Sequence, residues 1–79
     1  MSRFAAIDVG TNSVLLLVAE KKDGKFIAAL ERSEITRLGK GVDKSKQLAP
    51  ESIELTLSVI ERFAREARDA GAQKLVVSA

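Results

Sequence analysis

The sequence has no cysteine and no histidine among its 79 residues. The absence of cysteine excludes a disulfide framework and a thiolate nucleophile, and the absence of histidine excludes an imidazole base. Together the two absences exclude a zinc site of the usual kind, because such sites draw their ligands mainly from these residues. Any catalysis by this chain therefore depends on carboxylates, hydroxyls, amides, backbone dipoles or a hard metal ion.

Excess charge and long apolar runs are also lacking. The formal net charge is only +2, and basic residues are scattered among acidic ones, so we expect no nucleic-acid partner. No stretch reaches the roughly 20 apolar residues that a membrane helix needs, and the first residues lead straight into an apolar segment instead of a cleavable signal. We therefore expect a cytoplasmic protein with no membrane partner.

The length and composition indicate one small globular domain, because 46% of the residues are hydrophobic and 30% are charged. Arg3–Val9 and Ser13–Ala19 are nearly continuous apolar runs, which predicts two central strands covered on both faces. The Asp23-Gly24 pair predicts a tight hairpin turn with positive backbone angles, followed by a third strand at Phe26–Glu31. The first half of the chain thus forms three antiparallel strands.

The second half of the chain predicts a helical crossover. Ser33–Gln47 is polar and contains glycine, which favours a loop with one short helical turn at Ile35–Leu38. A helix then begins at Pro50 and ends at Gly71. The strand that follows, Gln73–Ser78, should lie parallel to the first strand and beside it, because a helical crossover precedes it.

The apolar residues of this helix recur at helical spacing and predict the face that packs on the sheet. They are Ile53, Leu57, Ile60, Phe63, Ala64, Ala67 and Ala70. The same kind of spacing assigns three aromatic side chains to the core, namely Phe4, Phe26 and Phe63. At the helix start, Ala49 occupies the cap position and offers no side-chain oxygen.

The expected fold class is therefore α/β, with a sheet in the order third, second, first, fourth strand and one main helix on one face. The other face has no cover in this sequence, although the two central strands are apolar. Further polypeptide would cover it, or a second copy forming a homodimer through the uncovered face. We expect the chain to be a fragment of a larger protein.

A polar turn separates the two central strands. Asp8 lies at the carboxyl end of the first strand, and Gly10-Thr11-Asn12-Ser13 turns the chain into the second. Glycine and three short polar residues expose backbone N–H groups and hydroxyls in a nest that suits phosphate oxygens. A carboxylate beside the nest repels phosphate but can hold a divalent cation that bridges to it. This pattern predicts phosphate binding at Gly10, Thr11, Asn12 and Ser13, and a metal at Asp8.

The same turn is also compatible with ordinary hairpin chemistry, in which Asp and Asn accept hydrogen bonds from nearby backbone, and both interpretations stay open at this point.

Four basic side chains can attract a polyanion or can be solvated surface charge, namely Arg37, Lys40, Lys44 and Lys46. Three carboxylates are interpreted as surface charge away from the Asp8 turn, namely Glu20, Glu31 and Glu34.

Three segments resemble a known family, the exopolyphosphatases and guanosine pentaphosphate phosphohydrolases of the actin, hexokinase and Hsp70 superfamily. Ala6–Ser13 is similar to the first phosphate loop of that family, Ile35–Gly39 to the segment that follows, and Leu48–Leu57 to its helix start. The resemblance implies a ribonuclease-H-like half domain. It also implies dependence on Mg²⁺ and hydrolysis of terminal phosphates from inorganic polyphosphate or guanosine pentaphosphate.

By position, the resemblance implies that Asp8 orients the metal and its waters, that Gly10 to Ser13 hold phosphate oxygens, and that Arg37 steers substrate. Many members carry arginine where this chain has Leu15, which cannot make a charge-assisted bond to phosphate. The catalytic glutamate and the second glycine-rich loop of the family lie beyond residue 79. Residues 1–79 are therefore expected to be a partial N-terminal phosphate-binding domain that is inactive alone, without a catalytic residue.

Two other functions compete with this interpretation. Kinases of the same superfamily also begin with Asp-x-Gly-Thr/Ser and a hairpin, although the Thr36–Gly39 segment and the helix start favour the phosphohydrolase. The second alternative is a non-catalytic module that associates with itself through its uncovered sheet face.

Overall fold

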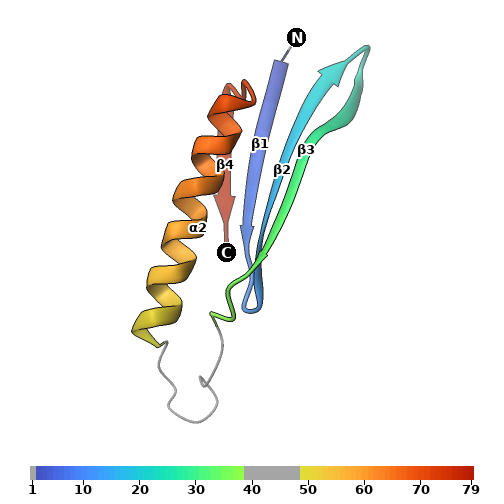
Figure 1. Cartoon of the computed structure of the whole chain (residues 1–79). Coiled ribbons are helices and arrows are strands. Elements are labelled where there is room, and N and C mark those ends of the chain that lie inside the picture. The colour runs from blue at the N-terminus through green and yellow to red at the C-terminus, as the bar shows by residue number, and fades with distance from the viewer. Residues whose placement is uncertain (1, 39–48) are drawn as a thin grey trace.

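The computed structural model describes residues 2–38 and 49–79. Its elements, in chain order, are β1 (Ser2–Val9), β2 (Ser13–Lys22), β3 (Lys25–Ile35), α2 (Pro50–Asp69) and β4 (Lys74–Ser78). The strands form one sheet in the order β3-β2-β1-β4, in which β1 is antiparallel to β2 and parallel to β4. Figure 1 shows α2 running along one face of this sheet. The predicted fold class and strand order are confirmed.

The third strand is longer than predicted, because it extends past Glu31 to Ile35. Its polar end stays extended because it pairs with the first half of β2, where Val14 lies opposite Glu34. The predicted helical turn at Ile35–Leu38 is wrong, since Ile35 ends a strand and Arg37 has a φ of 51°. The loop residues after Leu38, which include Lys40, Lys44 and Lys46, lie outside the described residues.

The turn between β2 and β3 agrees with its sequence. Asp23 and Gly24 have φ values of 52° and 76°, the left-handed pair that a two-residue hairpin turn requires. A β-bulge at Val18/Ala19 shifts the register between the two strands, and such bulges increase local twist.

The helix begins where the sequence predicts. Pro50 is its first residue, and the N-cap Ala49 makes no side-chain hydrogen bond. The Ala49 carbonyl instead accepts hydrogen bonds from the amides of Ser52 and Ile53, at 3.0 and 3.1 Å. These are the usual first hydrogen bonds of a helix, and the free N–H groups of its first turn have no side-chain cap.

At the other end, the helix is tied to β1. Gly71 has a φ of 85° and follows the helix, as predicted. The Arg3 guanidinium Nη1 donates to the Ala70 carbonyl at 2.6 Å, and the Gln73 amide donates to the Arg3 carbonyl at 2.9 Å. These contacts bring the chain back beside β1, so that β4 can pair with it.

The buried face of the helix was predicted correctly in part, since five of the seven predicted residues are buried or pack against the core, namely Ile60, Phe63, Ala64, Ala67 and Ala70. The helix nevertheless presents a partly different set of residues to the sheet. Its fully buried residues are Thr56, Val59, Phe63 and Ala67, whereas Ile53 and Leu57 are 37% and 59% exposed. The prediction followed hydrophobicity alone, but the Thr56 hydroxyl donates to the Ser52 carbonyl at 2.7 Å, which lets a polar residue enter the core without an unpaired hydroxyl. The helix residues that contact the sheet therefore lie on a face turned away from Ile53 and Leu57.

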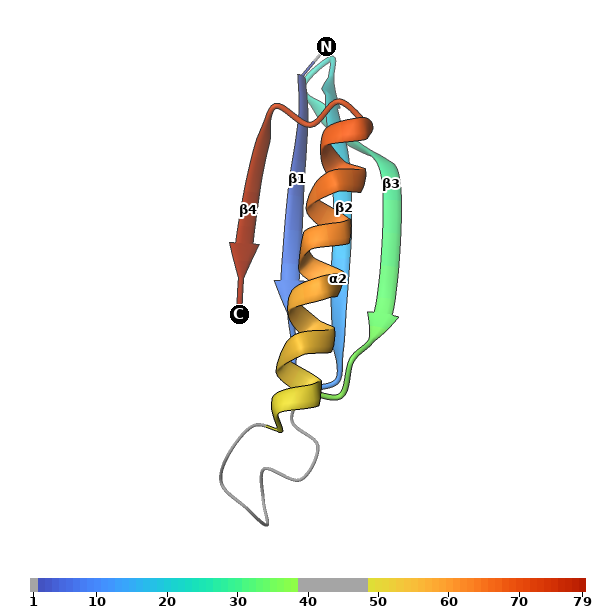
Figure 2. The ribbon, with the colours of Figure 1, turned by 60° about the vertical axis from the view of Figure 1, so that its left-hand side comes forward.

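The core lies between α2 and one face of β1 and β2, as Figure 2 shows. The strand residues in it are Ala5, Ile7, Val14, Leu16 and Val18. On the opposite face of the sheet, Leu15 and Leu17 are 45% and 40% exposed. The predicted uncovered face is therefore confirmed, and the prediction that both faces of the central strands are covered is wrong for the residues described.

Two of the three phenylalanines were assigned wrongly to the core. Phe4 is only half-buried and does not belong to the core cluster. Phe26 is 67% exposed, near the β2–β3 turn, and contacts Phe4 edge-on with ring centroids 6.4 Å apart. Phe63 is buried as predicted. Among the described residues, no helix is long and apolar enough to cross a membrane.

Candidate functional site

The turn between β1 and β2 is closed by a hydrogen bond of its own. The Gly10 amide donates to the Ser13 carbonyl at 2.9 Å. A Cβ atom at position 10 would lie 3.1 Å from the same carbonyl oxygen, so the close approach favours glycine. Of the four residues predicted to hold phosphate, Gly10 therefore shapes the turn and its amide is already used.

The middle of the turn remains open. Thr11 and Asn12 are exposed, and within residues 2–38 and 49–79 their amides make no backbone hydrogen bond. Ser13 is half-buried and begins β2. The open donors of the turn are thus the amides of Thr11 and Asn12, together with the Thr11 hydroxyl and the Asn12 carboxamide.

A contact from the end of β3 holds this turn in place. The Asn12 carbonyl accepts hydrogen bonds from the amides of both Thr36 and Arg37, each at 3.1 Å. Arg37 reaches this position with a left-handed φ of 51°, a conformation that costs a non-glycine residue about 1 kcal/mol or more. Its exposed side chain therefore starts beside the turn, where the sequence analysis placed a substrate-steering role.

Sequence reasoning missed the part played by Thr36. This residue is only 3% exposed, and among the described residues its hydroxyl oxygen Oγ1 is buried without a hydrogen-bond partner. No local pattern indicates a contact between Thr36 and Asn12, because the two are far apart in sequence. The left-handed backbone at Arg37 has no sequence signal either, since arginine rarely adopts it.

Asp8 lies on the sheet face opposite α2. In the sheet register, Leu15 of β2 is its neighbour on one side and Ser78 of β4 on the other. The Asp8 side chain is exposed, and the Ser78 hydroxyl donates to its Oδ1 at 3.5 Å. An arginine at position 15 would therefore be the direct cross-strand neighbour of Asp8, and leucine leaves that place without a cation.

The residues around Asp8 form at most a sparse metal site. No group of three or more His, Cys, Asp or Glu side chains that could hold a metal ion occurs in the part of the chain that the structure describes. An exposed single carboxylate is nonetheless a donor set that suits Mg²⁺, which keeps several waters and takes one or two carboxylates plus substrate phosphates.

Two of the other carboxylates are engaged in ion pairs. Glu20 lies 3.3 Å from the Arg3 Nε, at the far end of the sheet, and Glu34 lies 3.3 Å from Arg62. Glu34 is closer to the turn than predicted, because it pairs with Val14. It points to the face that α2 covers, however, whereas Asp8 points to the other face.

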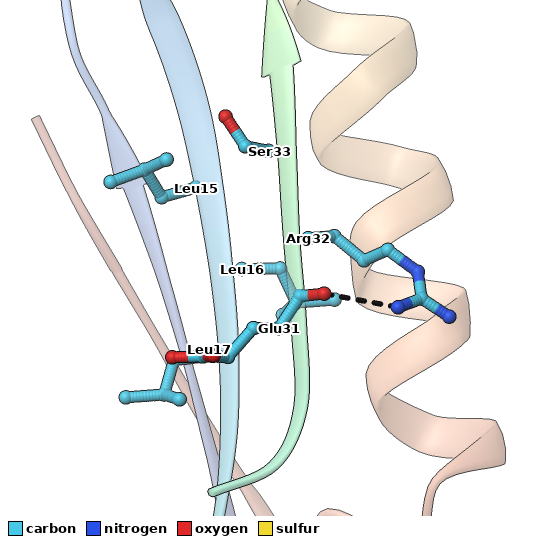
Figure 3. A pocket seen from close by; sticks show the side chains of 6 residues that line it. All are labelled: Leu15, Leu16, Leu17, Glu31, Arg32 and Ser33. Atoms are coloured by element: carbon cyan, nitrogen blue, oxygen red, sulfur yellow. Dashed lines mark hydrogen bonds between the residues drawn. The ribbon is translucent and has the colours of Figure 1, made fainter.

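A shallow depression of about 410 Å³ lies over β2 and β3 (Figure 3). The lining residues follow one another along each strand, so their side chains point to opposite faces of the sheet in turn. Figure 3 shows Leu15, Leu17 and Ser33 on the side away from α2. The Arg32 guanidinium donates to the Glu31 backbone carbonyl at 3.0 Å. Three of its six lining residues are leucines and one is a carboxylate, so the depression supplies no convergent set of phosphate donors.

The fold and the turn together define an α/β domain with a candidate ligand site at the carboxyl end of a central strand, where open α/β sheets bind their ligands. No model of a known protein family matches the chain. Exopolyphosphatase 2 of Mycobacterium tuberculosis is 40% identical over 68 residues, which are 81% of this chain and 21% of the relative. A bifunctional 3-dehydroquinate synthase/phosphatase of Fusobacterium nucleatum is 42% identical over 64 residues, which are 75% of this chain and 10% of that protein.

Solved structures agree with these relatives. The crystal structure of the Aquifex aeolicus Ppx/GppA phosphatase, type II variant, superposes with a TM-score of 0.93 at 34% identity, covering 99% of this chain and 26% of that one. The chain belongs to the Ppx/GppA exopolyphosphatase family. It spans 21% of the length of the Mycobacterium relative and 26% of the Aquifex chain.

Proposed function

We propose that residues 1–79 are the N-terminal phosphate-binding part of a phosphohydrolase that releases terminal phosphate from inorganic polyphosphate or guanosine pentaphosphate. The proposal depends on one observation, namely the open turn that follows Asp8. The amides of Thr11 and Asn12 have no backbone partner among the described residues, and the turn is held from behind at the Asn12 carbonyl. Donors fixed in this way suit an anion because they need no rearrangement to bind it.

In this proposal, the residues of the turn have different tasks. Thr11, Asn12 and Ser13 bind phosphate oxygens through amides and side chains, whereas Gly10 permits the close turn. Asp8 holds Mg²⁺ through its exposed carboxylate, and the bound ion would neutralise phosphate charge that the carboxylate alone would repel. Ser78 donates to Asp8 and so restrains its orientation.

Arg37 adds a positive charge at the edge of the turn. Its amide donates to the Asn12 carbonyl, so its exposed side chain starts beside the proposed phosphate site. A charge placed there attracts a polyanion and raises its local concentration. Leu15 removes another possible cation from the site, so Arg37 is the basic side chain on which substrate attraction depends within the described residues.

The proposal places no catalytic residue in this chain. Attack of water on a phosphoanhydride needs positioning and charge neutralisation from both sides of a cleft, and a single turn supplies one side. The isolated chain should therefore bind phosphate weakly and hydrolyse nothing. A cytoplasmic location also remains a prediction from the sequence. The relatives described above are phosphatases by name, so no observation favours the superfamily kinase.

A titration followed by NMR tests this function. The ¹⁵N-labelled 79-residue chain is titrated with tripolyphosphate in the presence and absence of Mg²⁺. We expect amide shifts confined to residues 8–13 and to residues 36–37, which share the Asn12 carbonyl, and a larger response with Mg²⁺. Shifts spread over all lysines, or no shift at the turn, would contradict the proposal.

A further inference from the structure

Two ion pairs join β3 to α2 in the part of the chain that the structure describes. The Arg62 Nη2 lies 3.3 Å from the Glu34 Oε2, and the Arg32 Nε lies 4.0 Å from the Glu66 Oε1. The pairs are reciprocal, because the strand supplies the base in one and the acid in the other. A spacing of two residues on a strand and of four on a helix keeps the side chains on facing sides of the two elements. The proposed phosphate binding uses none of these four residues.

The Glu34–Arg62 pair is the better fixed of the two. The Arg62 guanidinium lies over the ring of Phe63, 5.6 Å from its centroid, and Phe63 is buried in the core. A cation over an aromatic ring is attracted to it, so the ring holds the guanidinium in place. Arg32 instead donates to the carbonyl of the preceding residue in its own strand, and its separation of 4.0 Å from Glu66 is at the outer limit of an ion pair.

Glu34 is also close to the phosphate-binding turn. It lies opposite Val14 in the sheet register, and the amides of Thr36 and Arg37, two and three residues further on, donate to the Asn12 carbonyl at 3.1 Å. Thr36 is only 3% exposed, and a close-packed side chain has little room to shift. Figure 2 shows the end of β3 and the start of α2 at the same end of the sheet. A displacement of Glu34 is therefore passed on to the contact at Asn12.

We propose that Glu34 and Arg62 are positioning residues for the phosphate-binding turn. Their ion pair fastens the end of β3 to α2, so that the amides of Thr36 and Arg37 meet the Asn12 carbonyl and the turn keeps one shape. The inference rests on the proposed function for its ligand. Both side chains of the pair are about half exposed, and such pairs contribute little to global stability. The pair therefore acts on local opening of the β3 end, not on unfolding of the whole chain.

Hydrogen exchange of backbone amides, followed by NMR, tests the position of the turn without any phosphate. Glu34→Gln and Arg62→Gln should each raise the exchange rates of the Thr36 and Arg37 amides about threefold, because the end of β3 opens more often when the pair is lost. Unchanged rates at these two amides in both variants would overturn the proposal.

The weaker pair provides the matched control. Arg32→Gln and Glu66→Gln also remove an ion pair between β3 and α2, and they should leave the exchange rates at positions 36 and 37 unchanged. A charge reversal adds a rescue. The double variant Glu34→Arg with Arg62→Glu should exchange more slowly at these positions than either single reversal, because the attraction is restored. A double variant that exchanges as fast as the single reversals would overturn the proposal.

Affinity for tripolyphosphate in the presence of Mg²⁺ gives a second readout. Glu34→Gln removes a negative charge and Arg62→Gln removes a positive one, so an effect of net charge alone would change the affinity in opposite directions. Loss of positioning predicts that both variants bind about threefold more weakly. Affinities that move in opposite directions, or that do not change although the wild-type chain binds, would overturn the proposal.

The two readouts separate this inference from the proposed function. If the wild-type chain does not bind tripolyphosphate but the exchange results are as expected, the proposed function fails, whereas the control of the turn by the ion pair is supported. If the wild-type chain binds and neither readout responds to Glu34→Gln and Arg62→Gln, the proposed function stands and the positioning role is refuted.

Discussion

The two hairpin turns of this sheet reverse the chain by different means. Figure 1 shows them at opposite ends of the sheet. The β2–β3 turn consists of Asp23 and Gly24, both with left-handed φ, and nothing lies within 4 Å of a Cβ built at Gly24. The β1–β2 turn has no left-handed residue, and it is held by the hydrogen bonds that Asn12 accepts from Thr36 and Arg37.

The Asp23-Gly24 turn is therefore specified by its own residues, whereas the Gly10–Ser13 turn is held in shape by contacts with the rest of the fold. A two-residue turn with Asp-Gly needs only its local conformational preference. The longer Gly10–Ser13 turn leaves donors open, and an open turn keeps one shape only if something else restrains it. The contact at Asn12 supplies that restraint, and among the described residues the amides of Thr11 and Asn12 keep no backbone partner.

The largest expected difference between the two turns is the loss of tripolyphosphate affinity when the carboxylate of Asp8 or of Asp23 is removed. Asp8→Asn should lower the Mg²⁺-dependent affinity for tripolyphosphate by about 30-fold, or roughly 2 kcal/mol, because it removes the charge that holds the cation. Asp23→Asn is the matched control at the other turn and should leave that affinity unchanged. Titration calorimetry of both variants measures the difference, and equal losses would mean that the two turns are chemically alike.

A smaller difference is expected in folding stability. Gly24→Ala should lower the free energy of unfolding by about 1–2 kcal/mol, because it places a side chain at a left-handed φ. Tripolyphosphate shifts at residues 8–13 should persist in this variant. Gly10→Ala should disturb those shifts, because its Cβ would lie 3.1 Å from the Ser13 carbonyl. Urea unfolding and the NMR titration together test both statements, and intact phosphate shifts in Gly10→Ala would argue against them.

Replacing Thr36, whose amide donates to the Asn12 carbonyl of the Gly10–Ser13 turn, should increase stability. Thr36→Val should raise the free energy of unfolding by about 1 kcal/mol, because it removes a buried hydroxyl that has no partner among the described residues and keeps the side-chain shape. Thr56→Val is the matched control, since its hydroxyl donates to Ser52, and it should give no gain. Urea unfolding decides the matter, and a loss of stability in Thr36→Val would indicate that its hydroxyl has a partner.

The smallest effect is expected from Arg37. Arg37→Ala should weaken tripolyphosphate binding about threefold at low salt, and the difference should shrink as salt screens the charge. Lys25→Ala, at the opposite end of the sheet, should have no effect. Titrations at two salt concentrations measure both, and a loss in Arg37→Ala that is independent of salt would contradict electrostatic steering.

The sequence predicted most of the fold and less of the site. Continuous apolar runs and the Asp-Gly turn predicted the strands, the helical crossover predicted the place of the last strand, and Pro50 and Gly71 marked the ends of the helix. The helix face was predicted correctly at Phe63 and Ala67 but missed Thr56, because hydrophobicity could not show that the Thr56 hydroxyl bonds within the helix. At the site, Asp8 and the turn were predicted from type and spacing, but Thr36 could not be.

The chain by itself determined which segments are strands and helix, where the tight turn falls and which short polar residues follow Asp8. These properties depend on backbone preferences and on short periodicities, which are present in any window of the sequence. Only the tertiary structure decided that the Gly10 amide bonds to Ser13, that Asn12 is held from the end of β3, and that β4 is exposed along its length. Those facts depend on contacts between residues far apart in the chain, and such contacts exist only once the sheet has formed.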